Sequence, residues 1–341
     1  MAETKLTNII IPEVYSAYFN ENYVKRSRFF RSGVIQRSSE IDAKLAGGGS
    51  TFEMPFVKAV SATPDIPAET GTQTVNNATT GQETIRRQMR TIALGDNAIS
   101  RIFSGTNSLE KNLEQLTDVW VSDYDNVGIY SFQGLINDNL TNDSGDLVLD
   151  ISDDASPNIS DARILQAQAK HKENGISRAD NINGNFSAIV MHSNVYFYLV
   201  NQDAITFTAI SGQLRPLAFY HGMEVIVDDN CIRQAESGGY AYTTLLLKPG
   251  AMQVGYSSAG YESISYDRVE GRGMGVTQVY SRSVFAVHSP GFAWQGASMA
   301  GLSPTNNELA KGANWDRVAS SAQNCKWAAL IHEVPDAWEV A

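Results

Sequence analysis

The stretch SLEKNLEQLTDVWVSDYDNVGIY, residues 108–130, is the strongest structural signal in this 341-residue chain. Its apolar side chains recur at spacings of three and four and form one stripe on a 3.6-residue period: Leu109, Leu113, Leu116, Trp120, Tyr124 and Val127. Asn107 can cap its start, with Glu110 as the capping-box partner. The pattern predicts a helix roughly 35 Å long at ~1.5 Å per residue, which is a length suited to bracing a flat subunit.

The segment before this helix, residues 63–91, holds eight threonines and only six apolar residues. Threonine favours extended backbone, and Pro64, Pro67, Gly71 and Gly81 mark turns. The composition predicts a long two-stranded protrusion. Such a hairpin is marginal by itself in water and gains order by lying along another molecule. The alternative is a disordered surface loop. The charges that we expect to contact a neighbour here are Asp65, Glu69, Glu83, Arg86, Arg87 and Arg90.

Residues 1–49 are polar with scattered aromatic side chains and end in Gly47-Gly48-Gly49, a flexible break. We interpret them as an arm rather than a core element. A basic cluster within the arm is explained by a solvated helix face, or by contact with an acidic neighbour or packaged nucleic acid. Its members are Lys25, Arg26, Arg28, Arg31 and Arg37, of which the first four are predicted inter-subunit contacts.

Residues 137–161 contain seven aspartates and no basic residue. A calcium site is one interpretation and a solvated loop is the other, because the glycine and terminal glutamate of an EF-hand loop are missing. Ser160 and Asp161 are expected to open a second helix.

An α/β pattern follows from residue 185. Strands are predicted at residues 186–191, 223–227 and 240–247, with Ser193 capping a short helix after the first of them. Residues 263–267 and 276–288 are predicted to form a strand pair. Thr305 with Glu308 forms a capping-box pattern, and an apolar run occupies residues 327–331.

The formal net charge of −11 argues against tight binding to DNA or to an anionic membrane surface. No apolar run approaches the ~20 residues of a membrane span. Cys231 and Cys325 stand alone in the sequence, which favours reduced thiols in the core over a disulfide or metal role.

Motifs of catalysis are missing from the sequence. Residues 296–301 resemble a nucleophile elbow, but the second glycine follows the serine by three positions where the motif requires two. The five histidines are widely dispersed. Asp228 and Asp229 follow an apolar strand, a position where active sites occur, so an enzyme that uses this pair is one alternative. We predict no catalytic, cofactor-binding or metal-binding residue.

Six stretches in sequence order carry a family resemblance: TFEMPF (residues 51–56), AIVMHSNVY (188–196), GMEVIVDD (222–229), HSPGFAW (288–294), SPTN (303–306) and NWDRV (314–318). Together they resemble major capsid proteins of tailed bacteriophages with the HK97-like fold. The resemblance implies an α+β fold with an N-arm (1–49), an E-loop β-hairpin (50–100), a P-domain spine helix and following loop (101–160), an α/β A-domain (161–258), long P-domain strands (259–290) and a C-terminal segment in or beside the A-domain (291–341).

The resemblance also implies a function. Copies of the chain would assemble into hexamers and pentamers of an icosahedral shell that encloses double-stranded DNA without sequence-specific binding and without a membrane. A portal, a separate scaffolding protein and a decoration protein are implied partners. The implied location is the virion, after assembly in the host cytoplasm. No Lys, Asn and Glu match the crosslinking motif of some relatives. Reversing Arg86, Arg87 and Arg90 together is expected to leave the monomer folded and to impair shells. An encapsulin-like compartment shell is the alternative with the same fold.

Overall fold

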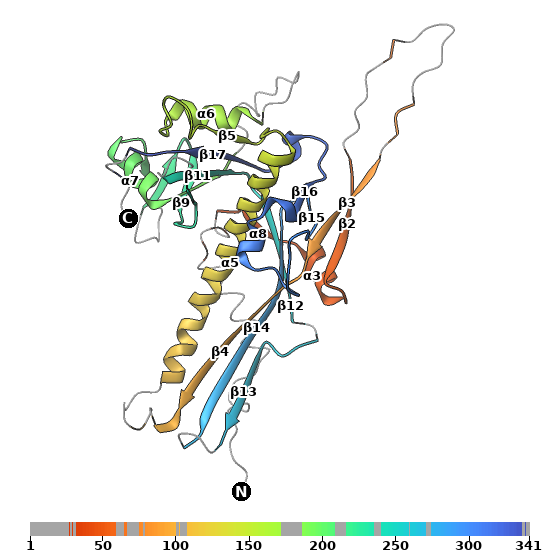
Figure 1. Cartoon of the computed structure of the whole chain (residues 1–341), viewed down its shortest axis with the longest axis vertical. Helices are drawn as coiled ribbons and strands as arrows, with labels where there is room; N and C mark the ends of the chain where they lie inside the picture. Colours follow the sequence, from red (N-terminus) through yellow and green to blue (C-terminus); the bar gives the residue numbers. More distant parts are fainter. Residues whose placement is uncertain are drawn as a thin grey trace.

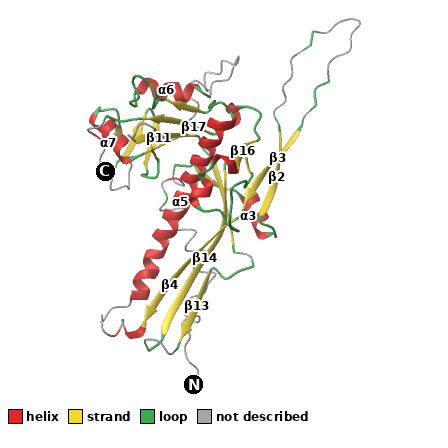
Figure 2. Ribbon diagram, viewed as in Figure 1, coloured by secondary structure: helices red, strands yellow, loops and turns green. Residues whose placement is uncertain are grey.

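The computed structural model describes residues 27, 29, 32–58, 65–66, 75–77, 79–99, 102, 108–171, 186–208, 216–234, 240–258, 260–270, 274–335 and 338. The molecule is elongated (Figure 1). A long helix and a sheet of long strands lie side by side in its lower half (Figure 1). A second sheet with two helices lies at one side of its upper half, and a narrow ribbon leaves the other side (Figure 2).

The long helix is α5 (Ser108–Asn142), with 35 residues. The helix was predicted, but its predicted end near Tyr130 is wrong, because apolar side chains continue to face the core at Phe132, Leu135 and Ile136. The helix stops where Ser144 and Gly145 adopt positive φ angles of 58° and 64°. Asn107, the expected cap, lies outside the described residues.

A five-stranded sheet lies against α5. Its strands are β1 (Ile35–Arg37), β4 (Gln88–Asn97), β12 (Met252–Ser257), β13 (Ile264–Val269) and β14 (Val276–His288). Strand β14 is central: β12 and β13 pair with successive halves of one edge, while β4 pairs with the other edge. The predicted strand pair at 263–267 and 276–288 is confirmed as β13 and β14.

The ribbon consists of β2 (Thr51–Val57) and β3 (Thr80–Arg86), paired from Thr51 with Arg86 to Val57 with Thr80. The two-stranded protrusion is therefore present, but it does not extend to residue 91 as predicted. Immediately after Arg87 the chain enters β4 of the five-stranded sheet, where Gln88 is already buried. The threonine-rich composition continues across this change of sheet, so composition alone does not reveal it.

An eight-stranded sheet fills the other part of the upper half. In spatial order its strands are β5 (Val148–Asp150), β17 (Trp327–His332), β11 (Tyr240–Leu247), β6 (Ala188–Met191), β9 (Met223–Val227), β8 (Leu217–Tyr220) and β7 (Thr206–Thr208), with β10 (Ile232–Gln234) also paired to β11. The strands predicted at 186–191, 223–227 and 240–247 are confirmed as β6, β9 and β11.

Both faces of this sheet are buried, which explains why its central strands are almost continuously apolar. Val190 and Leu245 point into the core shared with α5, whereas Ile189 and Leu246 point into a second core. That second core also holds side chains of α6 (Asp161–Ala169) and α7 (Ser193–Asn201). The predicted start of α6 is confirmed. The predicted cap of α7 is wrong, because the N-cap is His192, whose Nδ1 accepts a hydrogen bond from Asn194 N.

The interpretation of residues 1–49 as an arm is wrong for residues 34–46. Strand β1 pairs in parallel with β12, and helix α3 (Ser39–Ala46) buries Ile41 and Leu45. The contact is close because Gly255 has no Cβ: a methyl group at that position would lie under 3.0 Å from Ile41 Cγ2.

The segment after β14 packs on α5. It contains β15 (Phe292–Trp294), α8 (Asn306–Leu309), the 3-10 helices η3 (Gly312–Asn314) and η4 (Ala322–Asn324), and β16 (Trp315–Arg317). The predicted Thr305–Glu308 capping box is confirmed. Trp315 Nε1 donates to Leu309 O at 2.8 Å beside Gly134 of α5. The apolar run after it enters the eight-stranded sheet as β17.

Candidate inter-subunit surfaces

The ribbon of β2 and β3 projects from the body of the subunit (Figure 1). Val57 at the end of β2 is 68% exposed, and the isolated described residues Ile66 and Val75 beyond it are 92% and 83% exposed. Asp65 is also exposed. Three large apolar side chains between residues 57 and 75 are therefore exposed to solvent. Such grouping on a soluble protein is typical of an interaction surface.

The base of the ribbon is fastened to its own subunit by the three arginines that were expected to contact a neighbour. Arg86 donates to Leu302 O, and Arg87 donates to the carbonyls of Leu45 and Gly47 near the end of α3. Arg90, in β4, donates to Ser303 Oγ at 2.9 Å and to Asn306 Oδ1 at 3.3 Å. These contacts give the arginines a role within the chain.

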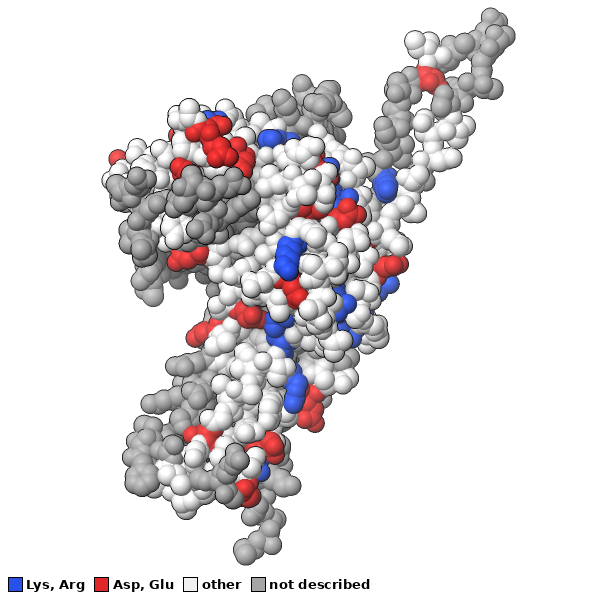
Figure 3. Space-filling model, in the orientation of Figure 1, with Lys and Arg blue, Asp and Glu red and all other residues white. Residues whose placement is uncertain are grey.

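Arg90 also lies 3.9 Å from Asp123 of α5. On the face drawn in Figure 3, basic side chains lie next to acidic ones along the middle of the molecule. Much of the basic charge on this face is thus close to carboxylates of the same chain, which weakens its attraction for a distant partner.

Among the predicted contacts that lie within the described residues, Glu83 is the buried one. Its carboxylate lies inside the subunit, 2.5 Å from His288 Nε2 and 2.7 Å from the backbone nitrogen of Gly291. No sequence pattern connects Glu83 with a residue 205 positions later, although Pro290 and Gly291 mark a turn there. Lys25, Arg26, Arg28, Arg31 and Glu69 lie outside the described residues.

The alternative site at Asp228 and Asp229 lies where the parallel strands β6 and β9 end. Asp229 accepts a hydrogen bond from Ser193 N at 3.1 Å, and this contact together with His192 lowers its pKa against the opposing effect of burial. Asp228 accepts from the backbone and side chain of Asn230, each at 2.9 Å. The two carboxylates thus stabilise the start of α7 and a turn.

The neighbouring residue His192 also has a structural role. Its Nδ1 caps α7, and burial lowers its pKa, so the neutral imidazole is favoured near pH 7. The groups at this strand edge therefore have structural partners, and the enzyme interpretation gains no support from them.

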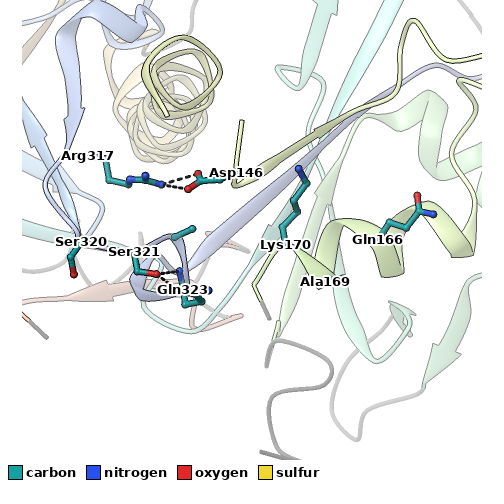
Figure 4. Close-up of a pocket in the computed structure, with 9 residues that line it drawn as sticks. Asp146, Gln166, Ala169, Lys170, Arg317, Ser320, Ser321 and Gln323 are labelled. Atoms are coloured by element: carbon teal, nitrogen blue, oxygen red, sulfur yellow. Dashed lines mark hydrogen bonds and ion pairs between the residues drawn. The ribbon is translucent and has the colours of Figure 1, made fainter. Parts of the chain in front are cut away.

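A polar hollow of about 640 Å³ opens between α6 and the segment after β16 (Figure 4). Arg317 points at Asp146 and donates to both of its carboxylate oxygens, at 2.8 and 2.7 Å. It also lies 3.1 Å from Asp143. Lys170, the C-cap residue of α6, also lines the hollow and donates to Gly145 O at 3.2 Å. The arginine ties the acidic loop to the C-terminal segment, and no sequence motif revealed this pairing.

The acidic segment 137–161 is not a single loop, because residues 137–142 belong to α5 and residues 148–150 form β5. Within the described residues, no three His, Cys, Asp or Glu side chains gather in a way that could hold a metal ion. No helix among the residues that the structure describes is long and apolar enough to cross a membrane. Cys231 and Cys325 are buried free thiols, as predicted.

Two sequence comparisons point to the same family. The family model for Gp13-like proteins, described as major capsid protein 13-like, matches residues 85–326. The major capsid protein of Bacillus phage SPP1 is 27% identical over 321 residues, which cover 93% of this chain and 95% of that protein.

Solved structures show the same fold at low sequence identity. The capsid of Ralstonia phage GP4 matches with a TM-score of 0.58 and 10% identity, over 89% of this chain and 88% of that chain. The cyanophage Pam1 capsid matches with a TM-score of 0.57 and 10% identity, over 92% and 94%. Since the family model spans most of the sequence, the chain belongs to the Gp13-like family of major capsid proteins, the shell proteins of tailed bacteriophages, and it has the HK97-like fold.

Proposed function

We propose that copies of this chain assemble into the hexamers and pentamers of an icosahedral shell that encloses double-stranded DNA. The location would be the virion, after assembly in the host cytoplasm. The role would be structural rather than enzymatic. The net charge of −11 suits a container that encloses its genome without clamping it.

The observation that supports self-assembly is the exposed apolar ribbon. Burying a Val or Ile side chain contributes about 1.5–3 kcal/mol, and three such side chains are exposed: Val57 in the ribbon, and Ile66 and Val75 beyond it. A two-stranded ribbon has too little surface to bury them itself. A neighbouring subunit could bury these side chains. Because a closed shell repeats the same contact at every subunit, the stabilising free energy would add up over the shell.

The parts of the subunit would divide this work. In this proposal, residues 50–86 form the E-loop, α5 with β4, β13 and β14 forms the P-domain, and the eight-stranded sheet forms the A-domain. Residues 1–33 would act as the N-arm, with Ser27 and Phe29 near its end buried in the body. The four basic residues of that arm remain predicted contacts with a neighbour.

Shell assembly in such a system would involve a portal, a scaffolding protein and a decoration protein. An encapsulin-like compartment is not favoured, because the relatives described above are phage capsid proteins. Co-expression with the products of neighbouring genes, followed by pull-down on a tagged capsid chain, tests each partner separately.

Sedimentation of the purified protein followed by electron microscopy tests the proposal. We expect closed shells for the wild-type chain and free subunits for the double variant Ile66→Asp with Val75→Asp. The matched control, Ile66→Leu with Val75→Ile, keeps both positions apolar and should form shells. Shells of normal yield from the aspartate variant would contradict the role given to the ribbon.

A further inference from the structure

The ribbon is attached to the body mainly by side chains. Strands β2 and β3 form a sheet of their own, and within the described residues neither strand pairs with the five-stranded or the eight-stranded sheet. Ile85 of β3 is buried in a small apolar cluster with Ile41, Leu45 and Ala286. Apolar contact of this kind is non-directional, so it holds the ribbon close without fixing its direction.

Glu83 supplies a directional contact, in addition to the hydrogen bonds that Arg86 and Arg87 donate at the base of the ribbon. Its Oε2 lies 2.5 Å from His288 Nε2, and its Oε1 accepts from Gly291 N at 2.7 Å. The side chains of Glu83 and His288 are 12% and 2% exposed. Each carboxylate oxygen thus has its own donor, and the two donors fix the orientation of the carboxylate, as in other two-point carboxylate contacts.

Both donors belong to rigid parts of the body. His288 is the last residue of β14, the strand that carries β4, β12 and β13. Gly291 has a φ of 95°, and its carbonyl accepts from Val318 N and Ala319 N, each at 3.0 Å. A Cβ on Gly291 would lie 3.1 Å from Ala319 Cβ. One carboxylate therefore connects the ribbon with the central strand and with the C-terminal segment.

We infer that the contact among Glu83, His288 and Gly291 is a latch that fixes the angle at which the ribbon leaves its subunit. The three residues are positioning residues, because they lie inside their own subunit and act through the ribbon. The second half of the inference rests on the proposed function: a fixed ribbon angle sets where the next subunit binds, and so sets the regularity of the shell.

The latch is tested first on unassembled subunits. Spin labels on cysteines at the exposed positions Thr80 of β3 and Ser122 of α5 report the distance between ribbon and body. Cys231 and Cys325 can remain, because both are buried. Double electron–electron resonance should give one narrow distance distribution for the wild-type background and a broader one for Glu83→Ala. Glu53→Ala, an exposed glutamate on the same ribbon, is the matched control and should keep the narrow distribution.

A second variant, Glu83→Gln, is included in case Glu83→Ala fails to fold. Glutamine keeps the shape of the side chain and leaves no unpaired charge in the buried site. We expect this variant to retain a cooperative thermal transition and still broaden the distribution. An unchanged distribution in folded Glu83→Gln and Glu83→Ala would overturn the latch. The shell is tested second, by electron microscopy of the same variants, with a loss of uniform particle size expected.

A variant with a broadened distance distribution whose shells are as uniform in size as those of the wild type would overturn the link between the latch and assembly. If the wild-type chain formed no shells at all, the proposed function would fail while the resonance measurement still reported on the latch. The two failures are therefore distinguishable.

Discussion

The indole Nε1 of Trp120 donates a hydrogen bond of 3.0 Å to Ser281 Oγ, and both side chains are buried. Trp120 lies in α5 and Ser281 lies in the half of β14 that pairs with β4 and β13. One turn later, the ring of Tyr124 meets that of Phe285 edge-on, with centroids 4.6 Å apart. The long helix is thus registered along the longest strand by specific polar and aromatic contacts.

Replacing Trp120 with Phe should lower the free energy of unfolding by about 1–3 kcal/mol, because Ser281 loses a buried partner. Chemical denaturation of the unassembled subunit measures the change. Val119→Ala, on the adjacent and 51% exposed position, is the control and should stay within about 0.5 kcal/mol of wild type. Equal effects of the two substitutions would show that the contact with β14 contributes nothing.

The packing of the C-terminal segment on α5 depends on Gly134. A Cβ there would lie under 3.0 Å from both Leu309 O and Trp315 Nε1, closer than side chains tolerate. Gly134→Ala should therefore destabilise the subunit, although alanine is normally favoured in a helix by about 1 kcal/mol.

Gly128→Ala in the same helix is the control for Gly134→Ala. The nearest atom to its Cβ is Met252 Sδ at 3.5 Å, an ordinary contact, so this substitution should be neutral or stabilising. Thermal unfolding compares the two variants. A Gly134→Ala protein as stable as Gly128→Ala would mean that the segment does not pack on α5 in this way.

His332 makes a defined contribution to the pH dependence of stability. Complete burial lowers its pKa to about 4, and the Nε2 atom lies 2.8 Å from Thr244 Oγ1. In the unfolded chain its pKa is about 6.5, so below that pH the unfolded state binds a proton that the folded state does not. The stability contributed by neutral His332 is thus present above pH 6.5 and is lost as the pH falls toward 4.

The expected difference is about 3 kcal/mol between pH 7 and pH 4, as an upper value for one buried histidine. Denaturation curves of wild type and His332→Gln at both pH values measure it, because the glutamine variant lacks the titrating group while other groups titrate in both proteins. Identical pH profiles for the two proteins would rule out this origin of acid sensitivity.

The contacts of Arg86, Arg87 and Arg90 change what their reversal should do. The sequence led us to expect a folded monomer, but each guanidinium donates to groups of its own chain. Arg87→Glu should destabilise the subunit by about 1–3 kcal/mol, since the carbonyls of Leu45 and Gly47 lose their donor. Arg268→Glu, at a side chain 64% exposed, is the control. A fully stable Arg87→Glu subunit that fails to assemble would favour a direct contact between Arg87 and a neighbour instead.

The elements that the sequence predicted well are those whose side-chain pattern is set by one local environment. Strands β9 and β11 have continuous apolar patterns, and α5 has one apolar stripe, because both strands contact a core and α5 does so from Leu116 onward. The predicted helix ended too early, because apolar side chains of α5 continue past Tyr130. The predicted protrusion extended too far, because the threonine-rich composition continues where the chain passes from the ribbon into β4. Helix α3 was missed because its burial depends on the absence of a side chain at Gly255.

The candidate surfaces were harder to predict than the fold. Charge and composition indicated the ribbon correctly, but they could not show which charges face inward. Glu83 and Asp65 have the same charge and belong to the same segment, yet Glu83 meets His288 of a strand far along the chain while Asp65 is exposed. Such pairings depend on tertiary contacts between distant residues, and no local pattern encodes them.

Self-assembly through the ribbon is decided by the environment of Val57, Ile66 and Val75 in assembled particles, which a cryo-electron microscopy reconstruction of purified shells would reveal. We predict that these three side chains, which are exposed in the single subunit, are buried against a neighbouring copy of the chain. Shells in which the ribbon folds back on its own subunit, or projects into solvent without touching a neighbour, would contradict this role.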